Sequence, residues 1–311
     1  MRSISSSRAV AAALLRGRSG HESIFRPLAR GAASRREGTK FDAERSPHIE
    51  QMPNFFTRIG FDASGPNSPL AAERDMIPYI VHQLWIEPPG EAPSSDPAPK
   101  DVQRNIATWT KHHPDLDIHL WRISELEDVL RDFEGHNVLE AIRICRFPTM
   151  QSNLIRLVLL YRFGGFWSDL KNFVNRPFLK ELLDEELVLV EHQPLADPRP
   201  PGYLTNSFLG ARPGHPFLLE CLKEGLAGID RRMTGSLSSV TGLVLMNRLF
   251  GRAKNANRVP PHRFLTIEEA WSDRMMRVAA SYQSGSRHWS QLQKTQSLYL
   301  DDPDDSSGQK S

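Results

Sequence analysis

The feature that most constrains the fold is an apolar helix that runs through two glycines directly into a short strand. Residues 153–163 place apolar side chains at helical spacing, which predicts a helix with a buried face. Gly164 and Gly165 predict its end, because glycine readily takes the left-handed conformation that closes a helix. The apolar residues 166–168 then predict a strand. A helix joined so closely to a strand is typical of α/β proteins.

Strands and helices alternate along the rest of the chain. Strands are predicted at 77–86, 116–121, 187–190 and 207–210, where β-branched, aromatic and other apolar residues predominate. Helices are predicted at 102–112, 125–133, 216–225 and 240–250, with Ser124 as the N-cap of the second. The expected fold class is therefore α/β: a sheet with parallel central strands, flanked by helices, with a ligand cleft at the carboxyl ends of its strands.

Composition divides the chain into four parts. Residues 1–38 form a basic leader rich in Arg, Ser and Ala, and residues 39–76 form a linker punctuated by Pro, Gly and Ser. Residues 77–290 hold the alternating elements and are expected to form one domain, followed by an acidic and polar tail at 291–311. The leader has the composition of a transit peptide, which predicts import into mitochondria or plastids. The Golgi or secretory pathway and the cytoplasm are the alternatives.

Charge and hydropathy argue against two kinds of partner. The first 36 residues contain eight arginines and one acid, Glu22, whereas the formal net charge of the whole chain is only +2. The remainder is therefore acidic, and no nucleic-acid partner is expected. No stretch approaches the roughly 18 consecutive apolar residues of a transmembrane segment. Cys145 and Cys221 lack a metal-type spacing and are expected to be buried free thiols.

Five blocks of sequence, in the same order, resemble glycosyltransferase family 32, the sugar-binding-region group with a DxD motif. The blocks are Ile-Val-His-Gln-Leu-Trp at 80–85, Trp109 with His-Pro-Asp at 113–115 and Leu-Trp at 120–121, Asn-Leu-Ile-Arg at 153–156, Gly-Gly-Phe-Trp-Ser-Asp at 164–169, and Asn-Ser-Phe at 206–208 with 211–216. Weaker matches are Thr-Gly at 241–242 and Trp289. The family is related to glycan mannosyltransferases and to the glucosyltransferase domains of large clostridial cytotoxins.

The resemblance implies a GT-A type sheet and transfer of a sugar from a UDP- or GDP-linked donor, with retention at the anomeric carbon. It also implies a divalent metal, Mn²⁺ or Mg²⁺, at the DxD motif. By this resemblance the residues matched to catalysis are Asp169, Lys171 and Asn206, and those matched to the donor are Trp85, Asn153, Arg156, Asp169 and Trp289. Asp169 is the residue matched to the metal. The acceptor stays open between a glycan, a lipid and a protein.

The chemistry of such a site can be stated without the family. A nucleotide-sugar leaves as a diphosphate, so the protein must neutralise negative charge that grows on the leaving group. Two closely spaced carboxylates can hold a hard cation against the phosphates. A planar arginine recognises phosphate with two parallel hydrogen bonds, and a tryptophan can stack on the base.

The chain departs from this pattern at its centre. The DxD motif reads Asp169-Leu170-Lys171, so the second carboxylate is an amine, and Asn153 stands where the family commonly has Asp. Two interpretations follow. The ammonium of Lys171 takes over the work of the metal in a metal-independent transferase, or the protein is a catalytically inactive descendant that acts as a binding or structural module.

Other conspicuous residues are expected to be structural. Trp109 and Trp121 are predicted to lie in the core, and His82 is predicted to be buried with its hydrogen bonds satisfied. The sequence contains no P-loop, no GxGxxG, no HExxH and no nucleophile elbow, which argues against the nucleotide-hydrolysing, dehydrogenase, zinc-protease and serine-hydrolase classes.

Overall fold

The computed structural model of the chain describes residues 76–87, 98–192, 200–281 and 292–301. All of them belong to one compact unit, Ser64–Ser311. The leader, nearly all of the linker and most of the tail lie outside the described residues, as does Trp289. Within the described residues, every helix is too short or too polar to cross a membrane.

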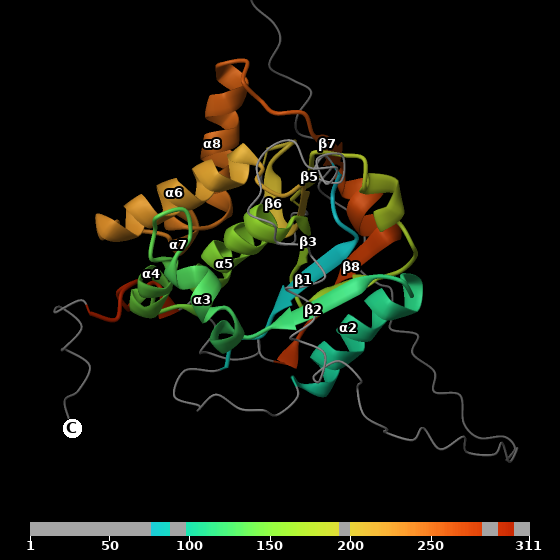
Figure 1. Ribbon diagram of the computed structural model, residues 1–311, viewed down its shortest axis with the longest axis horizontal. Helices are drawn as coiled ribbons and strands as arrows, with labels where there is room; N and C mark the ends of the chain where they lie inside the picture. The colour runs from blue at the N-terminus through green and yellow to red at the C-terminus, as the bar shows by residue number, and fades with distance from the viewer. Residues whose placement is uncertain (1–75, 88–97, 193–199, 282–291, 302–311) are drawn as a thin grey trace, which may run out of the picture. The chain divides into compact units, whose positions relative to one another are not determined.

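A six-stranded sheet forms the centre of this unit, in the order β2-β1-β3-β6-β5-β7 (Figure 1). The strands are β1 (Ile80–Leu84), β2 (Asp117–Trp121), β3 (Gly165–Ser168), β5 (Leu187–Glu191), β6 (Leu204–Ala211) and β7 (Arg263–Leu265). Five of them run in one direction and β6 runs opposite, because β6 pairs antiparallel with both β3 and β5 while the other pairs are parallel. The predicted α/β fold with a mostly parallel sheet is confirmed.

Helices cover both faces of the sheet (Figure 1). One group contains α3 (Glu127–Arg131), α4 (Val138–Ile144), α5 (Pro148–Phe163), α6 (Pro216–Asp230), α7 (Leu237–Val240) and α8 (Leu243–Asn255). The other side carries α2 (Lys100–His112) and a second sheet, in which β4 (Asn172–Val174) pairs antiparallel with β8 (Met275–Arg277). Shorter elements are the 3₁₀ turns η2 (Ile123–Glu125) and η3 (Leu179–Leu182) and the π-helix η4 (Glu268–Arg274).

The helix-to-strand joint between α5 and β3 forms as predicted. Gly164 and Gly165 have φ angles of 66° and 87°, which an L side chain rarely adopts. A Cβ atom on Gly164 would lie 2.7–2.9 Å from the rings of Pro213 and Pro78, so no side chain fits there. Glycine is therefore needed for both the backbone conformation and the close packing.

The buried side chains also agree with the sequence analysis. Trp109 is fully buried in the main core, where its ring stacks on Phe208 at a centroid distance of 6.1 Å, and Trp121 is buried as well. The side chain of His82 has both nitrogens bonded, to Trp121 and to the carbonyl of Gly164. Cys145 and Cys221 are free and buried.

Several local predictions were wrong. Ser124 does not cap a helix at 125–133, because Arg122 precedes the turn η2 and the carboxylate of Glu125 accepts from the backbone N–H of Arg122. The chain turns there before α3 begins. The predicted helix at 240–250 is two helices, α7 and α8, separated at Thr241 and Gly242, and α5 begins five residues earlier than expected, at Pro148. The short elements α4, β4, β7 and β8 were not predicted.

Candidate functional site

The residues that the family resemblance singled out meet where β3 ends. Asp169 follows the last residue of β3 and lies at the carboxyl end of a parallel strand pair, since β1 and β3 run side by side with His82 opposite Trp167. The helix α5 supplies Asn153 and Arg156, which are three residues apart and so lie on one face of the helix. Asn206 comes from β6, the neighbour of β3 in the sheet.

Arg156 is the centre of the polar contacts. Its guanidinium is 5% exposed and donates from Nη2 to Oδ1 of Asp169 at 3.1 Å. From Nη1 it donates to Oδ1 of Asn153 at 3.0 Å. The Cζ atom lies 4.7 Å from the centroid of the Trp167 ring, within the range of a cation–π contact. These contacts fix the charge of Arg156 in one place.

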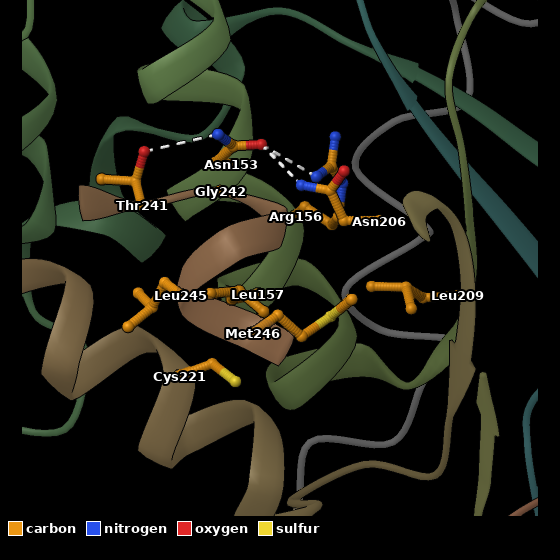
Figure 2. A pocket seen from close by; sticks show the side chains of 10 residues that line it. All are labelled: Asn153, Arg156, Leu157, Asn206, Leu209, Cys221, Thr241, Gly242, Leu245 and Met246. Carbon is orange, nitrogen blue, oxygen red and sulfur yellow. Dashed lines mark hydrogen bonds between the residues drawn. The ribbon is translucent and has the colours of Figure 1, made fainter. Parts of the chain in front are cut away.

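Asn153 joins three elements (Figure 2). Its Oδ1 also accepts from Nδ2 of Asn206 at 3.0 Å, and its own Nδ2 donates to Oγ1 of Thr241 at 3.3 Å. The tight packing continues at Gly242, where a Cβ atom would come within 2.9 Å of Asn153 Nδ2 and of the backbone of Ser238. The break between α7 and α8 thus serves to bring Thr241 and Gly242 against Asn153.

Asp169 is surrounded by donors and cations. Trp167 Nε1 donates to its Oδ1 at 3.0 Å, and the ammonium of Lys171 lies 3.5 Å from its Oδ2. Burial raises the pKa of this carboxyl, but the positive charges of Lys171, Arg156 and Arg277 and the bond from Trp167 together outweigh burial, so its pKa lies below the usual value. Asp169 is therefore ionised at neutral pH.

These residues do not fit a divalent metal. One oxygen of Asp169 is occupied by Arg156 and Trp167, and the other faces the ammonium of Lys171. Mn²⁺ or Mg²⁺ needs several oxygen ligands, and a cation beside Lys171 would be repelled. In the described part of the chain, no three His, Cys, Asp or Glu side chains gather as a metal site. Two cationic side chains, Arg156 and Lys171, thus contact the single carboxylate of Asp169.

A small cavity opens beside this cluster (Figure 2). Its volume is about 10 Å³, roughly the room that one water molecule requires. Most of its lining surface is apolar. The apolar side chains are Leu157, Leu209, Cys221, Leu245 and Met246, and the other lining residues are Asn153, Arg156, Asn206, Thr241 and Gly242. The cavity therefore has room for a single water molecule beside the polar cluster.

Two other predicted site residues lie apart from these contacts. Trp85, which follows β1, is partly buried and packs against the apolar cluster of Ala98, Val102 and Leu170. It therefore adjoins the turn that holds Asp169 and Lys171. Trp289 lies outside the described residues.

The sequence analysis missed Arg277, although its charge acts on Asp169. Arg277 belongs to β8, a three-residue strand more than a hundred residues after Asp169. Nothing in the spacing or composition of residues 275–277 distinguishes this arginine from its neighbours. The pairing of β8 with β4 reveals it, and only three-dimensional structure could do so.

The amino-acid sequence matches a known family over this same region. Residues 99–189 match the family described as "Glycosyltransferase sugar-binding region containing DXD motif". Over these residues the chain is similar to that glycosyltransferase family. The matched residues include α5, β3 and the turn from Asp169 to Lys171, so the resemblance predicted from the sequence blocks is confirmed.

Curated proteins similar to this chain come from yeasts. A mannosyl phosphorylinositol ceramide synthase, CSH1 of Saccharomyces cerevisiae, is 26% identical over 165 residues, which is 53% of this chain and 38% of that protein. Inositol phosphoceramide mannosyltransferase 3 of Schizosaccharomyces pombe is 26% identical over 152 residues, 48% of this chain and 37% of that protein. The chain therefore spans less than two fifths of the length of these relatives.

Among solved structures, similar chains are also glycosyltransferase domains. The ligand-free glycosyltransferase domain from the YGT toxin has a TM-score of 0.44 and 9% identity, over 64% of this chain and 83% of that one. The PaToxG glycosyltransferase has a TM-score of 0.40 and 14% identity, over 59% and 75%. With structural and sequence similarity this low, the fold of the chain is established by the strand order and directions described above.

Proposed function

We propose that this glycosyltransferase region transfers a sugar from a UDP- or GDP-linked donor to an acceptor, in a GT-A type site and with retention at the anomeric carbon. The observation that carries the proposal is the fixed arrangement of Arg156, Asp169 and Lys171 at the carboxyl end of β3, where open α/β sheets bind their ligands. The match to the sugar-binding region covers the same residues.

In the proposed reaction Lys171 supplies the positive charge that a metal supplies elsewhere. The diphosphate leaving group gains negative charge as its bond to the sugar breaks, and a cation already in position stabilises that charge without reorganisation. Lys171 is 26% exposed on its side chain, so one side of its ammonium is open to a ligand while Asp169 holds the other. Asn206 is only partly buried and can offer its amide to sugar or ribose hydroxyls, while the buried Asn153 holds Asn206 in place.

A second candidate is a catalytically inactive protein that keeps the fold as a binding or structural module. The ion pair between Lys171 and Asp169 favours it, because the pair occupies an oxygen that a metal ligand would need free. Under this alternative, nucleotide-sugars bind weakly or not at all.

Isothermal titration of UDP, GDP and their sugars, with Mn²⁺ and with EDTA, separates the two candidates. If Lys171 works in place of the metal, EDTA leaves donor affinity and donor hydrolysis unchanged. Lys171→Ala then weakens binding by about 1.5–3 kcal/mol, the worth of a hydrogen bond to a charged group. Lys180→Ala is the matched control, since Lys180 lies 3.5 Å from Asp115 in an exposed ion pair away from the site.

Lys171→Asp provides the converse test. It restores the carboxylate pair and is expected to make binding depend on Mn²⁺. Tight, metal-dependent binding to the unmodified protein would contradict the proposal, since it would require a ligand set other than Asp169. Absence of nucleotide binding with no effect of Lys171→Ala would favour the inactive module.

The names of the yeast relatives suggest the first acceptor to test. A mannosyl donor with inositol phosphoceramide is the pair that those names describe. We propose it here only as a starting point, alongside glycan and protein acceptors. For the compartment, we propose mitochondria or plastids from the leader, and a reporter fused to residues 1–39 tests this: a Golgi or diffuse pattern would overturn it.

A further inference from the structure

Arg277 is tied to the turn that contains Asp169 and Lys171. It lies in β8, directly opposite Asn172 of β4, which begins one residue after Lys171. The next residue, Val278, donates its backbone N–H to the carbonyl of Lys171 at 2.9 Å. The backbones of the two cationic residues are therefore held together by a strand pair, although they are far apart in sequence.

The side chain of Arg277 reaches the neighbouring strand β6. Its Nη2 donates to the hydroxyls of Thr205 and Ser207 at 2.9 and 2.7 Å, on either side of Asn206 in β6. The backbone N–H of Asp169 donates to the carbonyl of Ser207 at 2.9 Å, so the same residue of β6 contacts both Arg277 and Asp169.

The contacts of Arg277 orient its charge without cancelling it. Both hydroxyl partners are neutral, and the Cζ atom lies 4.7 Å from the centroid of the Trp271 ring. Its Nε is buried and has no hydrogen-bond partner among the described residues. Burial lowers the pKa of Arg277 and the charge of Asp169 opposes this effect. An arginine stays protonated in proteins, so its positive charge persists.

The charges around Asp169 are consequently unequal. Arg156, Lys171 and Arg277 each act on this one carboxylate. An ion cluster that served stability alone would be expected to contain equal positive and negative charge, because an uncompensated charge removed from water costs free energy. Three cations facing one carboxylate instead leave positive charge for an anion with more than one negative charge.

We infer that Arg277 binds the diphosphate of the donor together with Lys171, as a second cation that faces Asp169 from the β6 side. This inference rests on the proposed function. The donor's two phosphates carry their charge on separate groups, and two cations that different contacts hold near one carboxylate fit that distribution. Arg277 is then a binding residue of the site, and Thr205, Ser207 and Trp271 position it.

Titration with UDP and GDP in EDTA, compared with uridine and guanosine, tests the inference. Arg277→Met removes the charge at similar length and is expected to weaken nucleoside diphosphate binding at least tenfold, while nucleoside binding stays unchanged. Arg277→Lys keeps the charge and should restore most of the affinity. Arg176→Met is the matched control, because Arg176 follows β4 and is already paired with Asp273 at 2.6 Å.

The outcomes separate the two proposals. If the unmodified protein binds neither nucleoside diphosphate, the proposed function fails and the inference with it. If it binds and Lys171→Ala weakens binding while Arg277→Met does not, the function stands and the inference is wrong. If Arg277→Met weakens nucleoside and nucleoside diphosphate equally, or if Arg277→Lys gives no rescue, Arg277 has a structural role only.

Discussion

Two polar clusters lie beside the strands β1 and β3, and they are built on opposite principles. The first surrounds His82, which is fully buried beside the rings of Trp121 and Phe163, each at a centroid distance of 6.1 Å. Trp121 Nε1 can only donate, so His82 Nδ1 accepts from it at 3.0 Å and Nε2 donates to the Gly164 carbonyl at 2.9 Å. His82 is therefore neutral, and both of its nitrogens are satisfied.

The second cluster surrounds Asp169 and is neither neutral nor closed. Its one carboxylate faces three cations, and the Asp169 and Lys171 side chains are 22% and 26% exposed. The difference shows which polar groups maintain the fold and which are available to a ligand. Neutral groups whose hydrogen bonds are satisfied stabilise the sheet. An excess of fixed positive charge lowers stability but leaves the cluster able to bind an anion.

The largest expected effect is a loss of stability in acid that comes from histidines and not from Asp169. Burial lowers the pKa of His82 to about 3, and those of His113 and His215 to about 4, from an ordinary 6.5. The unfolded chain therefore binds more protons than the folded one below pH 6.5, and stability falls as pH decreases from there toward 4. Each histidine is expected to cost about 1–2 kcal/mol between pH 7 and 5.

Denaturant titrations at pH 7 and 5 measure this loss. Asp169 has a pKa below its usual value, so it keeps its charge over this range and the anion site should keep its nucleotide affinity in the folded protein. A stability that is flat from pH 7 to 5 would contradict the assignment of neutral, buried histidines.

Removing His82 is expected to have the next largest effect. His82→Ala leaves a cavity beside aromatic rings, and the Trp121 Nε1–H and the Gly164 carbonyl each lose the hydrogen bond to His82. The free energy of unfolding should fall by about 3–4 kcal/mol. The nucleotide affinity of the folded fraction should not change. If nucleotide affinity fell in proportion to stability, the two clusters would be energetically coupled, and the distinction between a structural cluster and a binding cluster would be wrong.

The sequence predicted much of what positions these clusters. The joint of α5 and β3 was predicted from the helical spacing at 153–163, the two glycines and the residues that follow them. This was possible because the whole joint is encoded by residues adjacent in sequence. The family resemblance brought Asn153, Arg156, Asp169, Lys171 and Asn206 into one site, and the structure places them in mutual contact, although their roles stay predictions.

The remainder depended on tertiary contacts that no local pattern encodes. The strands β4 and β8 are three residues each, too short for a period to be recognised, and β8 is formed by pairing across about a hundred residues. Arg277 could be found only through that pairing. The helix expected at 240–250 breaks at Gly242 because the packing of Asn153 requires the chain to come close there. Gly242 is a poor helix former, but a single glycine does not by itself show where a helix breaks.

Asp169→Asn tests the unbalanced cluster directly. The amide oxygen still accepts from Arg156 and Trp167, but the variant loses the carboxylate charge that, among the described residues, compensates the buried guanidinium. The free energy of unfolding should therefore fall by about 2–3 kcal/mol. Because the net positive charge of the cluster rises, UDP affinity in EDTA should be kept or increase severalfold. Loss of UDP binding in this variant would mean that the carboxylate itself holds the ligand or a metal, against the proposal of a cationic site.

The smallest expected effect comes from a matched pair of tryptophans. Trp167 and Trp271 are both buried, and each ring lies 4.7 Å from the Cζ atom of an arginine. Their Nε1 atoms differ in acceptor: Trp167 donates to the carboxylate of Asp169 at 3.0 Å, and Trp271 donates to the backbone carbonyl of Glu191 at 2.9 Å. Replacement of either by Phe removes similar volume and one hydrogen bond.

The two replacements should therefore differ by the charge of the acceptor alone. A bond to a charged group contributes about 1.5–3 kcal/mol and a neutral one about 0.5–1.5 kcal/mol, so Trp167→Phe should destabilise by about 1 kcal/mol more than Trp271→Phe at pH 7. The bond from Trp167 helps to hold the pKa of Asp169 below its usual value, so its removal raises that pKa. The extra cost is then present above the ordinary carboxyl pKa and is lost as pH falls through the pKa that Asp169 has in the folded protein. Denaturant titrations of both variants from pH 7 to 3 measure the difference, and equal costs at every pH would show that the environment of Asp169 is no more charged than that of the Glu191 carbonyl.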